Sequence, residues 1–266
     1  MDPNAFIRNV RHTIQVCPTW KDRISRLLWL YAKNDKVNSV KHKRAIRFSY
    51  PEPIGDIRLV VRNNGGSDSF ICSEVFDHRY YDFDLPYVPR TILDLGANAG
   101  FVTLYFARKY PDAALACVEP MADNISLLED NLKLNSVNAT ILPAAISVND
   151  GRLSMIAAPL DYGHKVADIE FGATVDGEVI EVEAITISSL MQRLNWKRIN
   201  LLKVDIEGYE GVLLKEGCDW LKYVDALCIE CHEGYGEEDL ILLSQKYGFS
   251  LPQKLPGTWL LTRKVN

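Results

Sequence analysis

Four short apolar runs in this sequence each end in an acidic residue, and the last of them also ends in a histidine. Asp94 stands near the end of the run TILDL, Glu119 follows ALACV, Asp205 follows LLKV, and Glu230 and His232 follow ALCI. Carboxylates and imidazoles can take up protons, hold hydroxyl groups or ligate a cation. Because the carboxyl ends of parallel strands meet at one edge of a sheet, we expect these side chains to line one ligand-binding crevice.

The glycines after Asp94 distinguish between possible cofactors. Gly96 and Gly100 are spaced G-x-x-x-G, unlike the G-x-G-x-x-G of nicotinamide and flavin proteins, and their turn offers no dedicated pyrophosphate cradle. Glu119 ends the next apolar run, where a carboxylate accepts hydrogen bonds from both hydroxyls of a ribose. This combination predicts a nucleoside without a pyrophosphate, such as S-adenosylmethionine, whose methionyl tail needs the room that glycines leave. The alternative is that both glycines serve only the turn.

Strand and helix patterns alternate after Thr91. Short apolar runs predict strands, and apolar residues at helical spacing predict the helices between them. Strands separated by helices indicate parallel βαβ units, so we expect an α/β fold with a doubly wound sheet. The predicted strands are 91–95, 114–120, 139–147, 199–208 and 224–234. The predicted helices are 101–110, 122–135, 185–194, 209–221 and 237–248.

Three parts of the chain lie outside that alternation. Residues 43–51 and 56–64 predict an antiparallel pair of strands across the turn PEPIGD, followed by a polar turn NNGGSDS. Residues 150–187 interrupt the alternation with two further strand-like stretches, which we interpret as an insertion over one end of the sheet. Residues 249–265 alternate weakly around turn residues and predict a closing antiparallel pair.

Charge divides the chain into two parts. Residues 1–50 hold eleven Lys and Arg against three acidic residues, or +8, which leaves −13 for the rest of a chain whose net charge is −5. We therefore expect a basic N-terminal extension, 1–50, and a main domain, 51–266. Helical spacing in 20–34 predicts an amphipathic helix in the extension. This helix either packs on the main domain or contacts a partner, a membrane surface, an acidic substrate or a second copy in a homodimer.

Composition also restricts the classes of function. No apolar run is long enough to span a membrane, and the N-terminus lacks the apolar core of a secretory signal, so we expect a cytoplasmic protein. The acidic motifs lie away from the basic residues, which argues against a nucleic-acid partner. Cys228 and Cys231 have CxxC spacing, but on a strand they point to opposite faces, so we expect free thiols.

Several segments taken together resemble one enzyme family. DLGANAGFVTLYFA, CVEPMADNISLLEDNLKLN, PAAIS, LLKVDIEGYEGVLLKEG and CIECHE are similar to the successive motifs of the FkbM-type S-adenosylmethionine-dependent methyltransferases. The similarity covers the chain roughly from Ser73 to His232. Its most specific part is K-x-D-x-E-G-x-E, formed by Lys203, Asp205, Glu207, Gly208 and Glu210.

The resemblance implies a fold and a set of cofactor contacts. The fold is the class I methyltransferase (Rossmann-like) fold, with a seven-stranded, mostly parallel sheet, helices on both faces and a reversed last strand; here an N-terminal helical and β-hairpin extension is added. Glu119 would hold the ribose, the residues after it the adenine, and the Asn98 loop the methionyl end. The residues expected near the cofactor are Asp94, Gly96, Asn98, Gly100, Glu119, Pro120, Asn124, Ala144, Ala145 and Asp205.

Methyl transfer to a hydroxyl needs more than a bound methyl donor. A sulfonium is a good leaving group, so the protein must mainly align acceptor, methyl and sulfur in a dry site. An alcohol holds its proton far above neutral pH, so a base or a metal must help to remove it. The catalytic candidates are His232, Asp205 and Glu230. We expect His232 to be the general base, tuned by a neighbouring carboxylate; in a variant of this hypothesis Asp205 and Glu230 hold magnesium.

Other polar and aromatic residues have both a functional and a structural interpretation. Lys203, Glu207 and Glu210 either act in the site or are structural charges, and His232 could be an ordinary surface histidine. The aromatic residues between 80 and 83 either line the acceptor channel and cover the adenine or pack in the core. His164, in the insertion, is a further candidate for the acceptor site. The aromatic candidates are Tyr80, Tyr81 and Phe83.

The sequence therefore predicts an S-adenosylmethionine-dependent O-methyltransferase. The family implies the acceptor class, which is a hydroxyl on a sugar, a glycan or a secondary metabolite. Two alternatives remain open: N-methylation of a small amine or amide, which relaxes the need for a base, and a catalytically silent nucleotide-binding module whose basic N-terminus recruits a partner. A nicotinamide dehydrogenase is disfavoured because the sequence lacks its glycine motif.

Overall fold

The computed structural model describes residues 3–31, 43–157, 165–166, 178–215, 217–232 and 234–263. Its main sheet has seven strands in the order β12-β13-β11-β10-β3-β4-β5. The strands from β5 to β11 are parallel, and β13 runs antiparallel to both of its neighbours. This confirms the mostly parallel sheet and the closing antiparallel pair. The bounds are Thr91–Leu95 (β3), Ala114–Val118 (β4), Ala139–Leu142 (β5), Leu201–Val204 (β10), Ala226–Ile229 (β11), Gln253–Lys254 (β12) and Trp259–Thr262 (β13).

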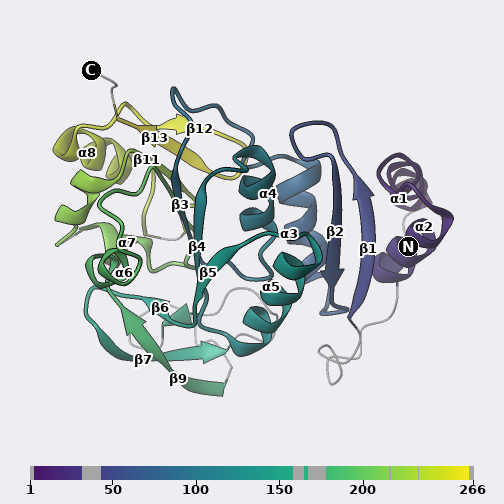
Figure 1. The fold of residues 1–266 in the computed structure, drawn as a ribbon, viewed down its shortest axis with the longest axis horizontal. Coiled ribbons are helices and arrows are strands. Elements are labelled where there is room, and N and C mark those ends of the chain that lie inside the picture. The colour runs from purple at the N-terminus through teal and green to yellow at the C-terminus, as the bar shows by residue number, and fades with distance from the viewer. Residues whose placement is uncertain are drawn as a thin grey trace.

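Helices cover both faces of this sheet, with α3, α4 and α5 on one side and α6, α7 and α8 on the other (Figure 1). Alternation along the strands explains the two layers. Ile92 and Leu201 belong to the core on the side of α4, whereas their neighbours Leu93 and Leu202 belong to the core on the side of α6, α7 and α8. The bounds are Ser67–Cys72 (α3), Phe101–Lys109 (α4), Ala122–Leu134 (α5), Ile187–Arg193 (α6), Glu210–Lys215 (α7) and Glu237–Tyr247 (α8).

Two helices and a hairpin form the N-terminal part and lie beyond α3 and α5 (Figure 1). The hairpin is antiparallel and α2 is helical, as predicted, whereas α1 was not expected. Trp29 of α2 joins these elements, because its indole nitrogen donates a 2.8 Å hydrogen bond to the carbonyl of Arg62. The expected domain boundary at residue 50 falls in the hairpin turn and separates two paired strands. The bounds are Pro3–Val16 (α1), Trp20–Tyr31 (α2), Arg44–Ser49 (β1) and Asp56–Val61 (β2).

A second sheet of four strands, in the order β6-β9-β7-β8, lies at one end of the main sheet, below β4 and β5 in Figure 1. Its antiparallel strands β7 and β9 confirm the extra strands predicted in 150–187. The predicted strand 139–147 is divided at Pro143, since proline has no N–H for the ladder: β5 stays in the main sheet and β6 pairs with β9. The bounds are Ala145–Ile146 (β6), Gly151–Ala157 (β7), Lys165–Val166 (β8) and Glu178–Ile185 (β9).

Two other segments differ from their predictions. The predicted polar turn contains the start of α3, which continues into a π-helix at Ser73–Asp77. The predicted helix 209–221 is divided into α7 and a 3-10 helix, Asp219–Tyr223, around Gly217, whose φ of 66° is left-handed. Among the described residues, no helix combines the length and the apolar character needed to cross a membrane.

Asp68 explains why the end of the predicted polar turn, where α3 begins, is buried. It forms an ion pair with Arg62, and the two side chains are 0% and 1% exposed. Asp68 accepts hydrogen bonds from the Arg62 Nη2 at 2.8 Å, from the Arg62 backbone nitrogen at 2.7 Å and from the Asn64 Nδ2 at 2.7 Å. Removing one member of a buried pair leaves the other charge desolvated without a counterion. The N-terminal hairpin is therefore fixed to the main domain by charge as well as by apolar packing.

We expect Asp68→Ala to lower the free energy of unfolding by about 3–5 kcal/mol, because it removes the carboxylate that pairs with the buried Arg62 guanidinium and accepts from the Arg62 backbone nitrogen. Denaturant titration followed by circular dichroism measures this loss. The matched control is Glu181→Ala, which removes the acid of an ion pair with Arg152 whose side chains are 65% and 68% exposed. That control should change stability by less than about 1 kcal/mol. Equal losses in the two variants would contradict the prediction.

Candidate active site

A cavity of about 240 Å³ lies at the carboxyl ends of β3, β4, β10 and β11. It brings together most of the residues that the sequence analysis singled out. Asp94 and Gly100 are exceptions. Asp94 is buried beneath the turn that follows β3. Gly100 immediately precedes α4 and does not line the cavity. From the expected cofactor set, Gly96, Asn98, Glu119, Pro120, Asn124, Ala144 and Ala145 line the cavity. The catalytic candidates Asp205, Glu230 and His232 line it as well.

Glu119 is the buried acid that follows β4. Its Oε2 accepts a hydrogen bond from the backbone nitrogen of Asn98 at 2.9 Å, and its Oε1 accepts from the Met121 nitrogen at 3.0 Å and the Asn124 Nδ2 at 3.1 Å. Burial raises the pKa of Glu119, and these three hydrogen bonds partly offset that effect. Because a carboxylate offers about four acceptor positions, the fixed side chain can still accept from a ligand hydroxyl.

Asn124 connects Glu119 to the N-terminal hairpin. Its amide nitrogen donates to Glu119, and its amide oxygen accepts a 2.9 Å hydrogen bond from the Nη1 of Arg62. Arg62 follows β2 and is held by Asp68. A chain of polar contacts thus runs from the hairpin to the cavity. Sequence spacing could not reveal it, because Arg62 and Asn124, which make the link, are 62 residues apart in the chain.

Lys203 joins β3 to β10 below the first turn. It lies opposite Asp94 in the strand register, with its Nζ 3.1 Å from the Asp94 Oδ1. The same ammonium donates to the carbonyls of Leu95 at 3.1 Å and Gly96 at 2.8 Å. Burial lowers the pKa of Lys203, but the charges of Asp94 and Asp205 outweigh burial and raise it. These contacts favour the structural interpretation of Lys203, although it also lines the cavity.

Gly96 and Gly100 allow close packing of the chain against itself. A Cβ on Gly96, whose φ is 75°, would lie 1.9 Å from the carbonyl oxygen of Asp205. A Cβ on Gly100, whose φ is 80°, would lie 2.4 Å from the Leu128 Cδ1. Their missing side chains therefore point at the protein, and the expectation that these glycines leave room for a methionyl tail stays a prediction.

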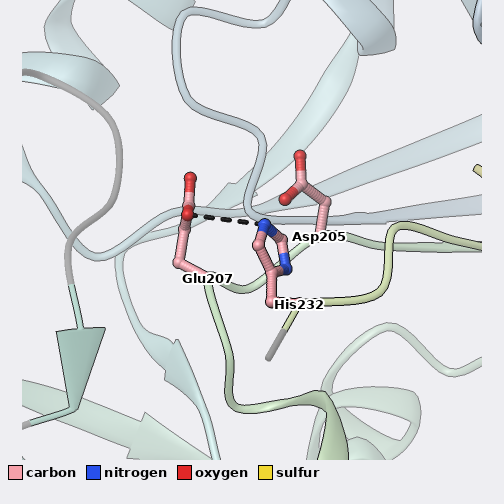
Figure 2. Close-up of side chains that lie close together, drawn as sticks. All are labelled: Asp205, Glu207 and His232. Carbon is pink, nitrogen blue, oxygen red and sulfur yellow. Dashed lines mark ion pairs between the residues drawn. The ribbon is translucent and has the colours of Figure 1, made fainter. Parts of the chain in front are cut away.

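Asp205, Glu207 and His232 face one another in the cavity (Figure 2). The Oε2 of Glu207 lies 3.6 Å from the Nε2 of His232, and the ring lies between the two carboxylates. Both acids point into the cavity, because Glu207 and Gly208 have φ values of 56° and 99° and form a left-handed turn one residue beyond Asp205.

Glu210 fixes the orientation of the His232 ring through the Nδ1 atom of the ring. Its side chain is 0% exposed, and its Oε1 is 3.0 Å from the His232 Nδ1. Glu210 also accepts hydrogen bonds from the backbone nitrogens of Ile206 and Gly208, each at 3.0 Å. This residue is the neighbouring carboxylate expected for His232, and the sequence analysis did not identify it as such. It directs the other ring nitrogen, Nε2, toward Glu207.

The clustered carboxylates change the protonation of their neighbours. Burial lowers the pKa of His232, but the hydrogen bond to Glu210 and the charges of Asp205 and Glu207 outweigh it and raise the pKa to about 9. Burial and the charge of Asp205 raise the pKa of Glu230 to about 8. At neutral pH His232 therefore holds the proton that a general base must lack. The base role of His232 stays a prediction, and Glu230 becomes a second candidate for it.

Glu74 is an acid of the cavity that the sequence analysis missed. It stands on the π-helix Ser73–Asp77 and lines the cavity. Burial and the charge of Asp205 raise its pKa to about 7. The sequence signal was its position in FICSEVF, where one acid interrupts apolar residues. Together with the acids after β10 and β11, it makes this end of the cavity strongly acidic.

The aromatic candidates divide between the cavity and the core. Tyr80 and Tyr81 line the cavity, whereas Phe83 packs edge-on against Phe106 with ring centroids 6.1 Å apart. Tyr80 fits against the C-terminal hairpin, because a Cβ on Gly257 would lie 2.1 Å from its ring. His164 lies outside the described residues.

Cys228 and Cys231 are free thiols placed on different sides of the sheet. Cys228 belongs to the core on the α4 side, and Cys231 packs against the core on the opposite side. This placement agrees with the alternation predicted for CxxC spacing, although Cys231 lies two residues beyond the end of β11.

The sequence matches the family model described as the methyltransferase FkbM domain over residues 94–251, which is more than half of the chain. The chain belongs to the FkbM methyltransferase family. The matched residues include Glu119, Asp205 and His232, so the cavity acids that follow β4, β10 and β11 lie within the family domain, whereas Glu74 precedes it. The strand order of this FkbM methyltransferase and its reversed β13 confirm the class I methyltransferase fold that the resemblance implied.

Named relatives match this FkbM methyltransferase over much of its length. Methyltransferase sdnD of Sordaria araneosa is 32% identical over 178 residues, which cover 55% of this chain and 67% of that protein. The 31-O-demethyl-FK506 methyltransferase FkbM of Streptomyces tacrolimicus is 23% identical over 223 residues, which cover 72% and 85%. A crystal structure of methyltransferase FkbM from Methylobacillus flagellatus KT is 12% identical with a TM-score of 0.46, and the match covers 96% of this chain and 58% of that chain.

Gly96→Ala should destabilise this FkbM methyltransferase, because the new Cβ overlaps the Asp205 carbonyl in addition to the strain of a positive φ. We expect the free energy of unfolding to fall by about 2–5 kcal/mol, as measured by denaturant titration. Gly217→Ala is the control, since Gly217 has a φ of 66° but no atom within 4 Å of the added Cβ. It should cost about 1–2 kcal/mol. A loss at Gly96 no larger than at Gly217 would show that the close approach does not matter.

Proposed function

We propose that this chain transfers a methyl group from S-adenosylmethionine to a hydroxyl oxygen of a sugar, a glycan or a secondary metabolite. The observation that carries the proposal is the make-up of a single cavity. Glu119, an acid suited to a ribose, lines it together with the acids and the histidine that follow β10 and β11. A nucleoside and an acceptor hydroxyl can therefore be held next to each other.

The cavity fits S-adenosylmethionine in two respects. Glu119 is oriented by three hydrogen bonds and keeps capacity to accept from a ribose hydroxyl. Apolar side chains of Val102, Pro120 and Met121 line the same cavity and suit an adenine ring. The bound cofactor supplies a methyl group on a positively charged sulfur: the methyl forms a bond to the acceptor oxygen, the sulfur–methyl bond breaks, its electron pair stays on sulfur, and the hydroxyl proton is released.

Glu230 is the residue we assign to that proton. It follows β11, lines the cavity and has a pKa raised to about 8 by burial and by Asp205, so its carboxylate is a far stronger base than an exposed glutamate. Glu230 therefore suits the role first expected of His232.

The walls of the cavity favour an acceptor with apolar surface. Phe70, Ile71 and Val75, from α3 and the π-helix, line the cavity beside Glu74, and Met155 of the second sheet lines it too. Phe70 is 56% exposed, so apolar surface extends to the outside of the protein. The relative from Streptomyces tacrolimicus is named for methylation of 31-O-demethyl-FK506. Both points support an apolar metabolite bearing a hydroxyl.

Glu119→Ala should weaken S-adenosylhomocysteine binding, because it removes a charge-assisted hydrogen bond to the ribose worth about 1.5–3 kcal/mol. We expect a dissociation constant about 10–100-fold higher by calorimetry. Asp123→Ala is the control, since Asp123 is an exposed acid in the first turn of α5. Glu119→Gln, which keeps the shape of the side chain, separates lost binding from lost folding. Unchanged affinity in folded Glu119 variants would overturn the cofactor assignment.

Glu230→Gln should slow methyl transfer by about 10²–10⁴-fold without changing S-adenosylhomocysteine affinity, because it removes the proton acceptor but not the ribose contact. The measurement is single-turnover methyl transfer to a pool of hydroxyl-bearing metabolites. Glu238→Gln, at an exposed position in the first turn of α8, is the control. Full activity in Glu230→Gln would exclude this residue as the base. Transfer only to amines by the unmodified protein would instead favour the N-methyltransferase alternative.

A further inference from the structure

Asp205, Glu207 and His232 offer ligand atoms to a common point. Among the residues that the structure describes, their two carboxylate oxygens and one ring nitrogen all lie within 4.8 Å of one another. Figure 2 shows the three side chains meeting from two chain segments, one after β10 and one after β11. Ligands at about 2.0–2.2 Å from a metal ion are roughly 3–4.4 Å apart, so small side-chain rotations bring all three to one cation.

The orientation of His232 matches that of a metal-binding histidine. Such a histidine uses one ring nitrogen for the metal and donates the other N–H to a carboxylate or carbonyl, which fixes the ring. Here the Nδ1 is 3.0 Å from the buried Glu210, and Glu210 is itself held by the backbone nitrogens of Ile206 and Gly208. The Nε2 remains on the side of Asp205 and Glu207. A cluster of acids that binds no metal would not need a separate carboxylate to fix the histidine ring.

The charges around the three residues leave a place for a cation. The ammonium of Lys203 lies 3.1 Å from Asp94 and 3.5 Å from one oxygen, Oδ2, of Asp205. The ammonium therefore pairs mainly with the buried Asp94 and lies near only one carboxylate oxygen of Asp205. The side chains of Asp205, Glu207 and His232 are 25%, 30% and 27% exposed, so water or an acceptor hydroxyl can complete the coordination.

The ligand types indicate which cation is suitable. Carboxylate oxygens suit magnesium, calcium and manganese, whereas imidazole suits zinc, copper, iron and nickel. Two carboxylates with one imidazole combine both preferences, and Mn²⁺ accepts oxygen and nitrogen ligands together. This differs from the magnesium site first expected at Asp205 and Glu230, because Glu207 and His232 take the place of Glu230.

We propose that Asp205, Glu207 and His232 bind a divalent transition-metal cation, represented by Mn²⁺, that holds the acceptor hydroxyl. The binding site stands on its own geometry, and its catalytic role rests on the proposed O-methyl transfer. The cation lowers the pKa of the hydroxyl bound to it, and the released proton passes to Glu230. No electron is transferred to or from the metal.

The test is titration of the purified full chain with MnCl₂ in the absence of any methyl donor. Electron paramagnetic resonance gives the free Mn²⁺, and pulsed measurements on the bound ion report magnetic coupling to an imidazole nitrogen. We expect one saturable site per chain with nitrogen coupling. Asp205→Asn and His232→Asn should each weaken binding by more than about 100-fold, and His232→Asn should abolish the nitrogen coupling.

Two further variants separate ligands from neighbours. Glu210→Gln should weaken Mn²⁺ by about 10–100-fold, because it loosens the ring without removing a ligand, and should leave S-adenosylhomocysteine affinity unchanged. Glu230→Gln removes a carboxylate from the same cavity but no ligand, so its loss should be smaller than that of His232→Asn. A larger loss in Glu230→Gln than in His232→Asn would move the cation to Asp205 and Glu230 and overturn the three-residue site.

S-adenosylhomocysteine binding, measured in the same samples, keeps this proposal distinct from the proposed function. Intact nucleoside binding with no saturable Mn²⁺, or with Mn²⁺ that lacks nitrogen coupling, would overturn the cation site alone. Saturable Mn²⁺ binding at these residues without nucleoside binding would support the cation site and count against the cofactor assignment.

Discussion

The buried ion pair between Lys203 and Asp94 is the interaction on which the cavity depends. The two residues lie opposite each other on adjacent parallel strands, and the ammonium also holds the carbonyls of Leu95 and Gly96. The second oxygen of Asp94 accepts a 2.6 Å hydrogen bond from Thr103 on α4. One pair of charges therefore connects two strands, the first turn and the helix that follows it. With the turn fixed in this way, Gly96 can lie against the Asp205 carbonyl, and the acids after β4 and β10 line one space.

That arrangement collects negative charge, and the collected charge explains much of the chemistry. Among the described residues that line the cavity, the acids are Glu74, Glu119, Asp205, Glu207 and Glu230, while the basic residues are Lys203 and His232. The ammonium of Lys203 is already paired with Asp94. Burial and the like charge of Asp205 favour the protonated carboxyls, which is why the pKa of Glu230 rises to about 8 and that of Glu74 to about 7. A cation that joins the carboxylates reverses this effect, since it favours their ionised forms.

The sequence predicted the parts of this architecture that depend on local patterns. Alternating strands and helices specify a doubly wound sheet, and residues at the ends of its strands must share one edge, so Glu119, Asp205, Glu230 and His232 could be placed together. Contacts between segments that are distant in the chain leave no comparable pattern in the sequence. The connection from Arg62 through Asn124 to Glu119 joins three elements, and the turn at Glu207 depends on a positive φ that spacing does not encode. Glu74 was missed because its π-helix resembles an ordinary apolar stretch in sequence.

The excess of acids also bears on the choice between oxygen and nitrogen acceptors. An amine entering a cavity lined by several carboxylates gains stability as its ammonium form, because opposite charges raise its pKa. An ammonium nitrogen has no lone pair for the methyl group, so this environment would hold an amine in an unreactive state. A hydroxyl remains neutral, and the same carboxylates can accept its proton or hold a cation that weakens the O–H bond. The electrostatics of the cavity thus work against N-methylation of an amine and agree with the oxygen acceptor that we propose.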